Sequence, residues 1–312
     1  MINNLKNWMK ALDENLKNIP LTQLAIPGTH DSMTYSITSS APVSPDSEDI
    51  VKWLSKHFCL PKFLIHKWCI TQKASIIHQL VKGIRYFDLR LATKPGDQEF
   101  YFVHGLYAST INDPLKELNH FLHENSEEVV ILDFQHFYDF SSQDHRQLLQ
   151  EVRNLFREKI CPAPSNLSSI TLKWMKEHNY QVIIIYRNDI FLNDKKVWPG
   201  KLWPTPWPNT TDTQYLIDYV TQELKSRNNS VGLVTQCILT PDIKFVLLHP
   251  FGGLERNCAY RCYSNMLQWL GQQSPGLNGV NIVIIDFFDK NGEEFSQSVV
   301  NLNFKLLNKS IL

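Results

Sequence analysis

Short runs of β-branched and aromatic residues alternate along the chain with more polar segments of helical length. The short runs predict strands, and the longer segments predict helices. The predicted strands span residues 21–26, 83–91, 100–103, 128–134, 181–186, 231–238 and 281–287. The predicted helices span residues 3–14, 47–57, 113–124, 143–159, 168–178, 212–226, 256–271 and 294–307. The pattern therefore predicts an α/β protein.

The predicted strands are nearly continuous in their apolar character, which is typical of a parallel sheet that helices cover on both faces. No linker or change of composition divides the alternation, so we predict a single domain over residues 1–312. The length suits a distorted or incomplete (β/α)8 TIM barrel. An open, doubly wound sheet is the alternative fold, although no glycine-rich phosphate loop follows any predicted strand.

Composition and charge narrow the class of partner. The 312 residues are 43% hydrophobic and include 31 basic and 31 acidic side chains, which gives a formal net charge of zero. This balance argues against a nucleic-acid partner and against a polybasic membrane patch. Residues 1–18 lack the uninterrupted apolar core of a signal peptide, and no run reaches the length of a transmembrane segment. We therefore expect a cytoplasmic protein.

Cysteine usage agrees with that expectation. Without a secretory route, the six cysteines are expected to be reduced thiols rather than a disulfide framework. Cys258 and Cys262 could join His249 at a metal ion, but the spacing lacks a second close pair of ligands. We expect no metal ion and no other cofactor.

The stretch at residues 26–32, Ile-Pro-Gly-Thr-His-Asp-Ser, places reactive side chains beside a predicted strand. Pro27 and Gly28 are expected to end that strand, because proline lacks a backbone donor and glycine permits unusual dihedral angles. His30 and Asp31 then lie at the C-terminal tip of the strand. The alternative for this stretch alone is an ordinary turn that Asp31 caps, with a solvated histidine.

Polar side chains also collect at the ends of the other predicted strands. In chain order the set is His30, Asp31, Asp88, Arg90, His104, Asp133, His136, Arg187, Gln236 and Asp286. Any one of them alone is more often structural, as an internal ion pair or a satisfied core histidine. In a barrel, however, all of these strand ends open onto the face where barrel enzymes place their catalytic groups. Their joint placement predicts an active site.

Two histidines, an arginine and several carboxylates suit phosphoryl transfer. One histidine can take a proton from an attacking hydroxyl while the other protonates the leaving oxygen. A guanidinium can hold the phosphate and stabilise its developing charge. Carboxylates beside the histidines would fix their tautomers and favour the imidazolium. Acyl transfer and zinc proteolysis lack their parts, since the chain has no Gly-x-Ser-x-Gly elbow and no helical His-x-x-x-His pair.

At these residues the chain resembles the X-domain family of phosphatidylinositol-specific phospholipase C, and especially its short intracellular members. The resemblance begins near Trp8-Met9 and covers nearly the whole chain. Its motifs are IPGTHDS at 26–32, GIRYFDLR at 83–90, VHGL at 103–106, VVILDF at 129–134, LTP at 239–241 and NIV at 281–283, with Asp286 and Phe287. The set in this order is far more specific than any one motif.

The resemblance implies a distorted barrel that cleaves phosphatidylinositol to diacylglycerol and a cyclic inositol phosphate. His30 is similar to the general base that acts on the inositol 2-hydroxyl, with support from Asp286. His104 is similar to the general acid that protonates the diacylglycerol oxygen, with support from Asp31. Asp88 and Arg90 complete the phosphate site.

Other positions of the resemblance concern metal dependence and the headgroup. In the large calcium-dependent members an acidic residue stands at the position of Arg90, so this chain resembles the metal-independent type, in which a guanidinium replaces the cation. Secreted bacterial members carry an inositol-binding lysine after the fourth strand, where this chain has Asp133-Phe134-Gln135-His136. Asp133, Gln135 and Arg187 are carried over as candidate substrate-binding residues.

Two other functions stay open. A glycerophosphodiesterase on the same barrel would need a cluster of acidic calcium ligands, and Arg90 argues against that placement. A non-catalytic module that binds inositol phospholipids would need only the pocket, although the presence of both histidines and both supporting carboxylates favours catalysis.

The implied substrate lies in a bilayer, so we expect peripheral membrane contact through apolar side chains. Two stretches are candidates for that contact. Residues 53–68 place aromatic and aliphatic residues among lysines, and residues 198–207 place three tryptophans in a proline-rich loop. The second loop could equally cover the barrel core.

Overall fold

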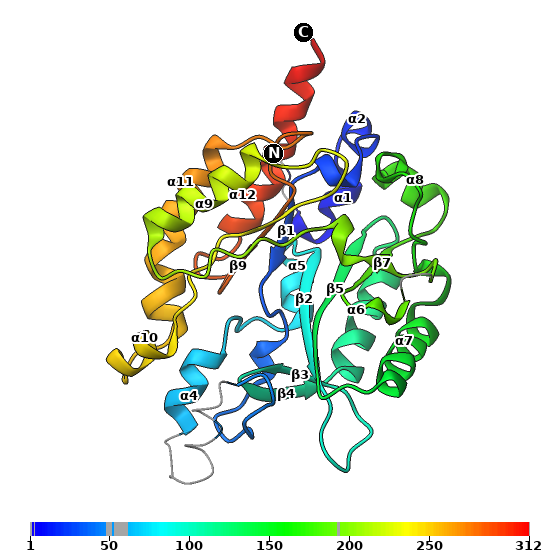
Figure 1. The fold of residues 1–312 in the computed structure, drawn as a ribbon. Coiled ribbons are helices and arrows are strands. Elements are labelled where there is room, and N and C mark those ends of the chain that lie inside the picture. Colours follow the sequence, from blue (N-terminus) through cyan, green and yellow to red (C-terminus); the bar gives the residue numbers. More distant parts are fainter. Residues whose placement is uncertain (1, 3, 48–51, 53–61, 192–193, 312) are drawn as a thin grey trace.

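Figure 1 shows the computed structural model, which describes residues 2, 4–47, 52, 62–191 and 194–311. The predicted helix at 47–57 lies almost wholly outside the described residues, as does most of the candidate membrane stretch at 53–68.

The described strands form one curled sheet. Its parallel path runs in the order β7 (Trp198–Pro199), β6 (Val182–Tyr186), β5 (Val130–Tyr138), β2 (Tyr86–Ala92), β1 (Ile26–Thr29), β9 (Ile282–Ile285) and β8 (Val234–Gln236). A hairpin of β3 (Tyr101–His104) and β4 (Leu106–Thr110) adds antiparallel pairing to the end of β2. No ladder joins β7 to β8 in the described part of the chain, so the barrel is incomplete. The predicted fold class is confirmed.

Helices surround the sheet on its outer face (Figure 1). They are α5 (Ile76–Val81), α6 (Asn112–Glu124), α7 (Ser142–Phe156), α8 (Leu172–Glu177), α9 (Thr213–Lys225), α11 (Tyr260–Gln272) and α12 (Glu294–Leu302). The short helices α1 (Trp8–Ala11) and α2 (Glu14–Lys17) lie at one end of the barrel, while α4 (Lys62–Cys69) and α10 (Ile243–Leu248) lie at the other (Figure 1). A π-helical turn, Glu255–Ala259, precedes α11.

Strand geometry divides the residues between two cores. Successive side chains of a strand point to opposite faces, so alternate residues enter the barrel or pack beneath the helices. On β2, for example, Tyr86 belongs to the inner core, and Phe87 and Leu89 belong to the outer one. The inner core also contains Ile26, Ile131, Ile183, Ile185, Val234, Ile282 and Ile284. The residue that lies two positions after each of these inner-core residues also points into the barrel. At the C-terminal ends of the strands, these inward positions are occupied by the polar residues of the predicted site.

Backbone contacts close the gap between β7 and β8 without a strand ladder. The N–H of Gly232 donates to the carbonyl of Leu202 at 2.9 Å, and the N–H of Val234 donates to that of Pro204 at 2.9 Å. The indole of Trp203 is buried at this seam and donates to Asn281 Oδ1 at 2.8 Å. A Cβ at position 232 would lie 1.9 Å from Trp203 Nε1, so this position requires glycine.

The burial of these tryptophans changes one expectation. Trp198 and Trp203 are both fully buried, so most of the apolar surface of the loop at 198–207 belongs to the core. Trp207 is 52% exposed and is the one tryptophan of that loop whose side chain could contact a membrane.

The predicted strand at 21–26 is wrong in its bounds. Residues 21–23 form a 3-10 turn, and β1 begins at Ile26, so Pro27 and Gly28 lie inside the strand. Pro27 is tolerated because its missing N–H falls where β2 has not yet begun, while its carbonyl accepts from the N–H of Arg85 at 2.9 Å. Gly28 is needed for space, because it lies between inner-core side chains of β2 and β9.

The N-terminal segment seals the end of the barrel opposite the site. The predicted helix at 3–14 is interrupted between α1 and α2, where Asp13 caps α2. Trp8 is fully buried and its indole donates to the Gly83 carbonyl at 2.9 Å. Beneath it Arg85 and Glu128 form a buried ion pair of 2.7 Å, and Glu128 also accepts from the backbone N–H of Lys10 at 2.9 Å.

We predict that Gly28→Ala destabilises the fold. The added Cβ would lie 2.8 Å from Tyr86 Cδ1 and 2.9 Å from Ile284 Cγ2, and neither buried side chain has space to move. Overpacking of this kind should lower the free energy of unfolding by about 1–3 kcal/mol, as measured by chemical denaturation. Gly271→Ala on α11 is the matched control, since its Cβ meets no atom within 4 Å. Equal stability of the two variants would contradict the close packing at Gly28.

Candidate active site

His30 and Asp286 form a buried pair at the ends of adjacent strands. β1 and β9 pair in register at Thr29 and Ile285, so the next residue of each strand is brought together. His30 Nδ1 lies 2.8 Å from Asp286 Oδ1, and both residues are buried. With its Nδ1–H donated to the carboxylate, the ring presents Nε2 toward the neighbouring strand β2.

The Nε2 atom of His30 has two competing partners. It lies 3.0 Å from Arg90 Nη2, whose N–H can donate only when Nε2 is unprotonated. It also lies 3.2 Å from Asp31 Oδ2. Burial by itself would lower the pKa of His30, but the charges of Asp31 and Asp286 outweigh burial and raise the pKa to about 9. A proton and the Arg90 guanidinium therefore compete for one nitrogen.

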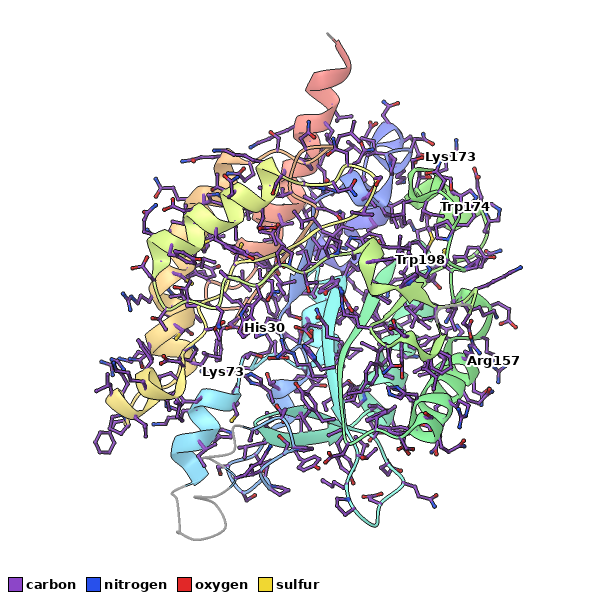
Figure 2. The ribbon with its side chains drawn as sticks, viewed as in Figure 1. His30, Lys73, Arg157, Lys173, Trp174 and Trp198 are labelled. Carbon is purple, nitrogen blue, oxygen red and sulfur yellow. The ribbon has the colours of Figure 1, made fainter. Side chains whose placement is uncertain are left out.

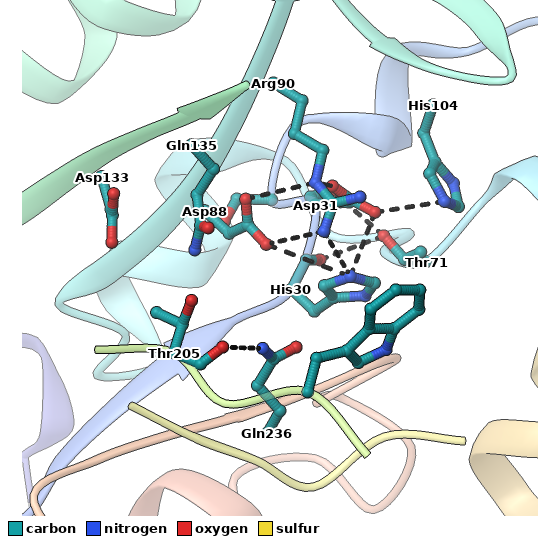
Figure 3. A network of polar contacts seen from close by, with 12 residues as sticks. His30, Asp31, Thr71, Asp88, Arg90, His104, Asp133, Gln135, Thr205 and Gln236 are labelled. Carbon is teal, nitrogen blue, oxygen red and sulfur yellow. Dashed lines mark hydrogen bonds and ion pairs between the residues drawn. The ribbon is translucent and has the colours of Figure 1, made fainter. Parts of the chain in front are cut away.

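Asp31 lies between the cationic groups (Figure 3). Its Oδ1 is 2.5 Å from Arg90 Nε, and its Oδ2 is 3.2 Å from Nε2 of both His30 and His104. These contacts are ion pairs that lack the angles of hydrogen bonds. Burial would raise the pKa of Asp31, but the charge of Arg90 and then those of the histidines hold it below the usual value. Asp31 is therefore a buried anion shared by one guanidinium and two imidazoles.

Asp88 and Arg90 project from the same strand toward this anion. Arg90 Nη2 lies 3.3 Å from Asp88 Oδ2, so the guanidinium contacts both carboxylates. Ligand atoms of His30, Asp31 and Asp88 lie within 4.8 Å of one another, a spacing that could hold a metal ion. A calcium ion at this place would have to displace the guanidinium from both of its carboxylates. The donor set therefore does not fit a metal ion while Arg90 is in place.

His104 ends β3 and faces His30 across Asp31. The two ring centroids are 6.1 Å apart. His104 Nδ1 lies 2.8 Å from the carbonyl of Cys69, which fixes the ring and leaves Nε2 toward Asp31. Gly105 then turns the chain with a φ of +70°, and its N–H donates to the carboxylate of Asp46 at 2.6 Å. His104 is thus held from both sides.

Two residues that the sequence did not single out hold the backbone of His30 and Asp31. The Thr71 hydroxyl lies 3.1 Å from the carbonyl of His30 and 3.0 Å from that of Asp31. Gln72 Nε2 donates to the carbonyl of His30 at 3.1 Å and to that of Ile285 at 2.9 Å. Both side chains are fully buried. The only signal in the sequence is a polar pair that follows the apolar end of a helix.

A second polar group lies deeper in the barrel. Asp133 accepts two hydrogen bonds from Arg187, at 2.9 and 2.7 Å, and one from the Tyr86 hydroxyl at 2.7 Å. Gln135 Nε2 donates to the same hydroxyl at 3.1 Å. Asp133 is fully buried, and only Arg187 and Gln135 of this group line the cleft described next.

A cleft of about 660 Å³ opens above these residues. Its polar wall includes His30, Arg90, His104, Gln135, His136, Arg187, Gln236 and Asp286. Its apolar wall includes Trp68, Trp207, Ile243, Val246 and Leu254. Figure 2 shows His30 near the middle of the molecule, which matches the position of the site inside the barrel mouth. The cleft can therefore take a ligand with a polar head and an apolar tail.

The predicted site residues thus fall into two groups. His30, Asp31, Asp88, Arg90, His104 and Asp286 form one continuous network, much of which Figure 3 shows. Asp133, Gln135 and Arg187 form the second group. The structure brings all nine to the mouth or the upper interior of the barrel.

Comparisons with known proteins agree with this architecture. Residues 64–188 match the family model described as phosphatidylinositol-specific phospholipase C, X domain. The chain is 39% identical over 302 residues to PI-PLC X domain-containing protein 3 of Mus musculus, covering 96% of this chain and 93% of that protein. It is 40% identical over 308 residues to PI-PLC X domain-containing protein 2 of Mus musculus, covering 98% of this chain and 89% of that protein.

Solved structures share the fold at low sequence identity. The phosphatidylinositol-specific phospholipase C of Listeria monocytogenes is 17% identical, with a TM-score of 0.64 over 96% of this chain and 98% of that chain. A mutant of the Staphylococcus aureus enzyme is 14% identical, with a TM-score of 0.67 over 96% of this chain and 100% of that chain.

We predict that Asp286→Asn lowers the pKa of His30. The change removes an anion 2.8 Å from the imidazole and so removes a charge that stabilises the protonated ring. The pKa should fall from about 9 by about one to three pH units, as read from the pH dependence of the His30 ring resonances in NMR spectra. Asp113→Asn, an exposed change on α6, is the control. If the pKa of His30 changes as little in Asp286→Asn as in Asp113→Asn, the electrostatic role of Asp286 is refuted.

Proposed function

Because the chain belongs to the family of PI-PLC X domain-containing proteins, we propose that it is a phosphodiesterase acting on phosphatidylinositol-type lipids. The products are diacylglycerol and a cyclic inositol phosphate. The observation that carries this proposal is the pair of histidines, with ring centroids 6.1 Å apart, on the two sides of a guanidinium and a shared carboxylate at the cleft. This arrangement offers a proton acceptor, a proton donor and a phosphate-binding cation within one site.

The first step is activation of the inositol 2-hydroxyl by His30. An incoming phosphodiester offers the Arg90 guanidinium an anionic acceptor in place of Nε2 of His30. In the neutral form of His30, Nε2 is then free to take the hydroxyl proton, and Asp286 stabilises the imidazolium that forms. Phosphate binding and the ability of His30 to accept a proton are therefore coupled, because both depend on whether the Arg90 guanidinium donates to the phosphate or to Nε2 of His30.

The second step is departure of diacylglycerol. A bond forms between the inositol 2-oxygen and phosphorus, and the bond between phosphorus and the diacylglycerol oxygen breaks. His104 gives its Nε2 proton to that oxygen, while its Nδ1–H remains on the Cys69 carbonyl. Arg90, held by Asp31 and Asp88, neutralises the charge that develops on the phosphate oxygens. No step in this scheme requires a metal ion.

The substrate brings the barrel mouth to a lipid surface, and we propose that α10 makes the contact in a cytoplasmic, peripherally bound protein. No helix of the described residues is long and apolar enough to cross a membrane. Leu247, Leu248 and Phe251 are 65%, 68% and 83% exposed at the end of α10. On the same helix Ile243 and Val246 line the cleft, so this apolar surface is continuous with the site. A lipid tail could pass from the bilayer along α10 into the cleft.

We predict that the purified protein hydrolyses phosphatidylinositol in vesicles when EDTA is present, and that added calcium does not raise the rate. His30→Ala and His104→Ala should each lower kcat by at least about 10²-fold, because each removes a proton-transfer group. Release of water-soluble inositol phosphate measures the rate. Circular dichroism spectra show whether each variant is folded, and His30→Gln replaces His30→Ala if burial of the site makes the alanine variant unstable.

A substrate whose leaving group has a low pKa separates the two histidines. Such a leaving group needs little protonation, so it should partly restore turnover by the His104 variant but not by the His30 variant. Binding of phosphatidylinositol without turnover by the wild-type protein would refute the enzymatic proposal and support the non-catalytic alternative.

We also predict that Leu247, Leu248 and Phe251 changed together to alanine weaken binding to phosphatidylinositol vesicles in a sedimentation assay. Turnover of vesicle substrate should fall by roughly tenfold or more, since each large apolar side chain contributes about 1.5–3 kcal/mol on burial. Hydrolysis of a soluble cyclic inositol phosphate should be unchanged. Leu277→Ala is the control, because Leu277 is 52% exposed but lies before β9, at the opposite end of the barrel. Equal losses on both substrates would refute membrane contact by α10.

A further inference from the structure

A β-bulge in β5 changes which side chains face the cleft. The pairing of β2 with β5 runs from Leu89 with Phe134 to Arg90 with His136, so Gln135 is the extra residue. In a regular strand His136 would point to the outer core with Phe134. The bulge instead turns two consecutive side chains, Gln135 and His136, toward the barrel mouth. Bulges of this kind re-aim side chains and are frequent beside active sites.

The two side chains that the bulge turns toward the mouth differ in their partners, because Gln135 donates to the Tyr86 hydroxyl whereas His136 has no hydrogen-bond partner among the described residues. His136 lies opposite Arg90 across the strand pair and lines the cleft. Tyr138, two residues further along β5, lines the same wall, with its ring centroid 6.0 Å from that of His136. Within the described part of the chain, neither the imidazole nor the phenol has a hydrogen-bond partner, whereas His30 and His104 are both tied to protein groups.

The charges around His136 are those of the phosphate site. Partial burial and the positive charge of Arg90 lower the pKa of His136, and Asp88 and Asp31 oppose them. The His136 side chain is exposed because it faces the open cleft. A neutral imidazole at this place has one N–H to donate and one lone pair to accept. Arg90 and His136 are paired across the strands and both line the cleft, so an N–H of the imidazole can reach an anion held by the guanidinium.

We propose that His136 is a substrate-binding residue that donates a hydrogen bond to the phosphate group held by Arg90. The inference rests on the proposed function, because that function places the phosphodiester at Arg90. Under this proposal, the β5 bulge places a third histidine at the phosphate site, whereas a regular strand would direct it into the outer core. His136 takes no part in proton transfer, which belongs to His30 and His104.

Binding of myo-inositol 1-phosphate, measured by isothermal titration calorimetry, tests this role. His136→Ala should weaken binding by about tenfold or more, as expected for loss of a hydrogen bond to a charged group. His136→Gln keeps a donor and should restore most of the affinity. His120→Ala, which removes an exposed histidine on α6 that does not line the cleft, is the matched control and should bind as the wild type does. The NMR signals of the His136 ring should shift when myo-inositol 1-phosphate is added.

The outcomes separate this inference from the enzymatic proposal. If His136→Ala binds as tightly as the wild type, or if the wild type binds no myo-inositol 1-phosphate, the inference is overturned. If affinity for phosphate-free myo-inositol falls equally, the contact is to the ring and the inference is also overturned. If binding depends on His136 but the wild type turns over no lipid, the enzymatic proposal fails and the binding role stands. His136→Phe, of similar size but without a donor, replaces His136→Ala should the latter unfold.

Discussion

The buried carboxylate of Asp31 is the group on which the rest of the candidate site depends. An isolated anion in a barrel interior would cost several kcal/mol, and here one guanidinium and two imidazoles surround it. Its backbone adopts a left-handed φ of +41°, which aspartate tolerates better than most residues. The Thr71 hydroxyl stabilises that turn by donating a hydrogen bond to the carbonyl of Asp31. Removing this carboxylate would leave His104 without its carboxylate partner, while Arg90 would keep only Asp88 and His30 would keep Asp286.

The strand register determines how close these groups come. Pairing of β1 with β9 aligns His30 with Asp286, and pairing of β1 with β2 aligns it with Asp88. The apolar residues of the inner core thus fix the position of the polar groups that follow them along the strands. A shift of one residue in any of these pairings would turn the polar side chains into the outer core, beneath the helices. The same strand register therefore determines both the packing of the barrel and the geometry of the site.

Much of this arrangement follows from the sequence, because strand period and strand ends are local properties. The polar groups after the strands, such as Asp286 after β9, were predictable from that pattern. Three features were not predictable, since each depends on contacts between distant parts of the chain. They are the seam at Trp203, the bulge at Gln135, and the hydrogen bonds from Thr71 and Gln72 to the backbone of His30 and Asp31. The end of β1 was misplaced because proline usually interrupts strands, and only the register with β2 makes Pro27 acceptable inside this one.

The seam between β7 and β8 also affects how the barrel deforms. A closed ladder spreads strain over every strand, whereas this ribbon has two ends joined by backbone hydrogen bonds and a buried indole. We therefore expect deformation of the barrel to be concentrated at the seam between β7 and β8. That place borders the cleft, because Gln236 donates to the carbonyl of Thr205 across it and both residues line the cleft wall. We therefore expect the wall formed by Gln236 and Thr205 to deform more easily than the wall that carries His30 and Arg90, whose strands pair in continuous ladders.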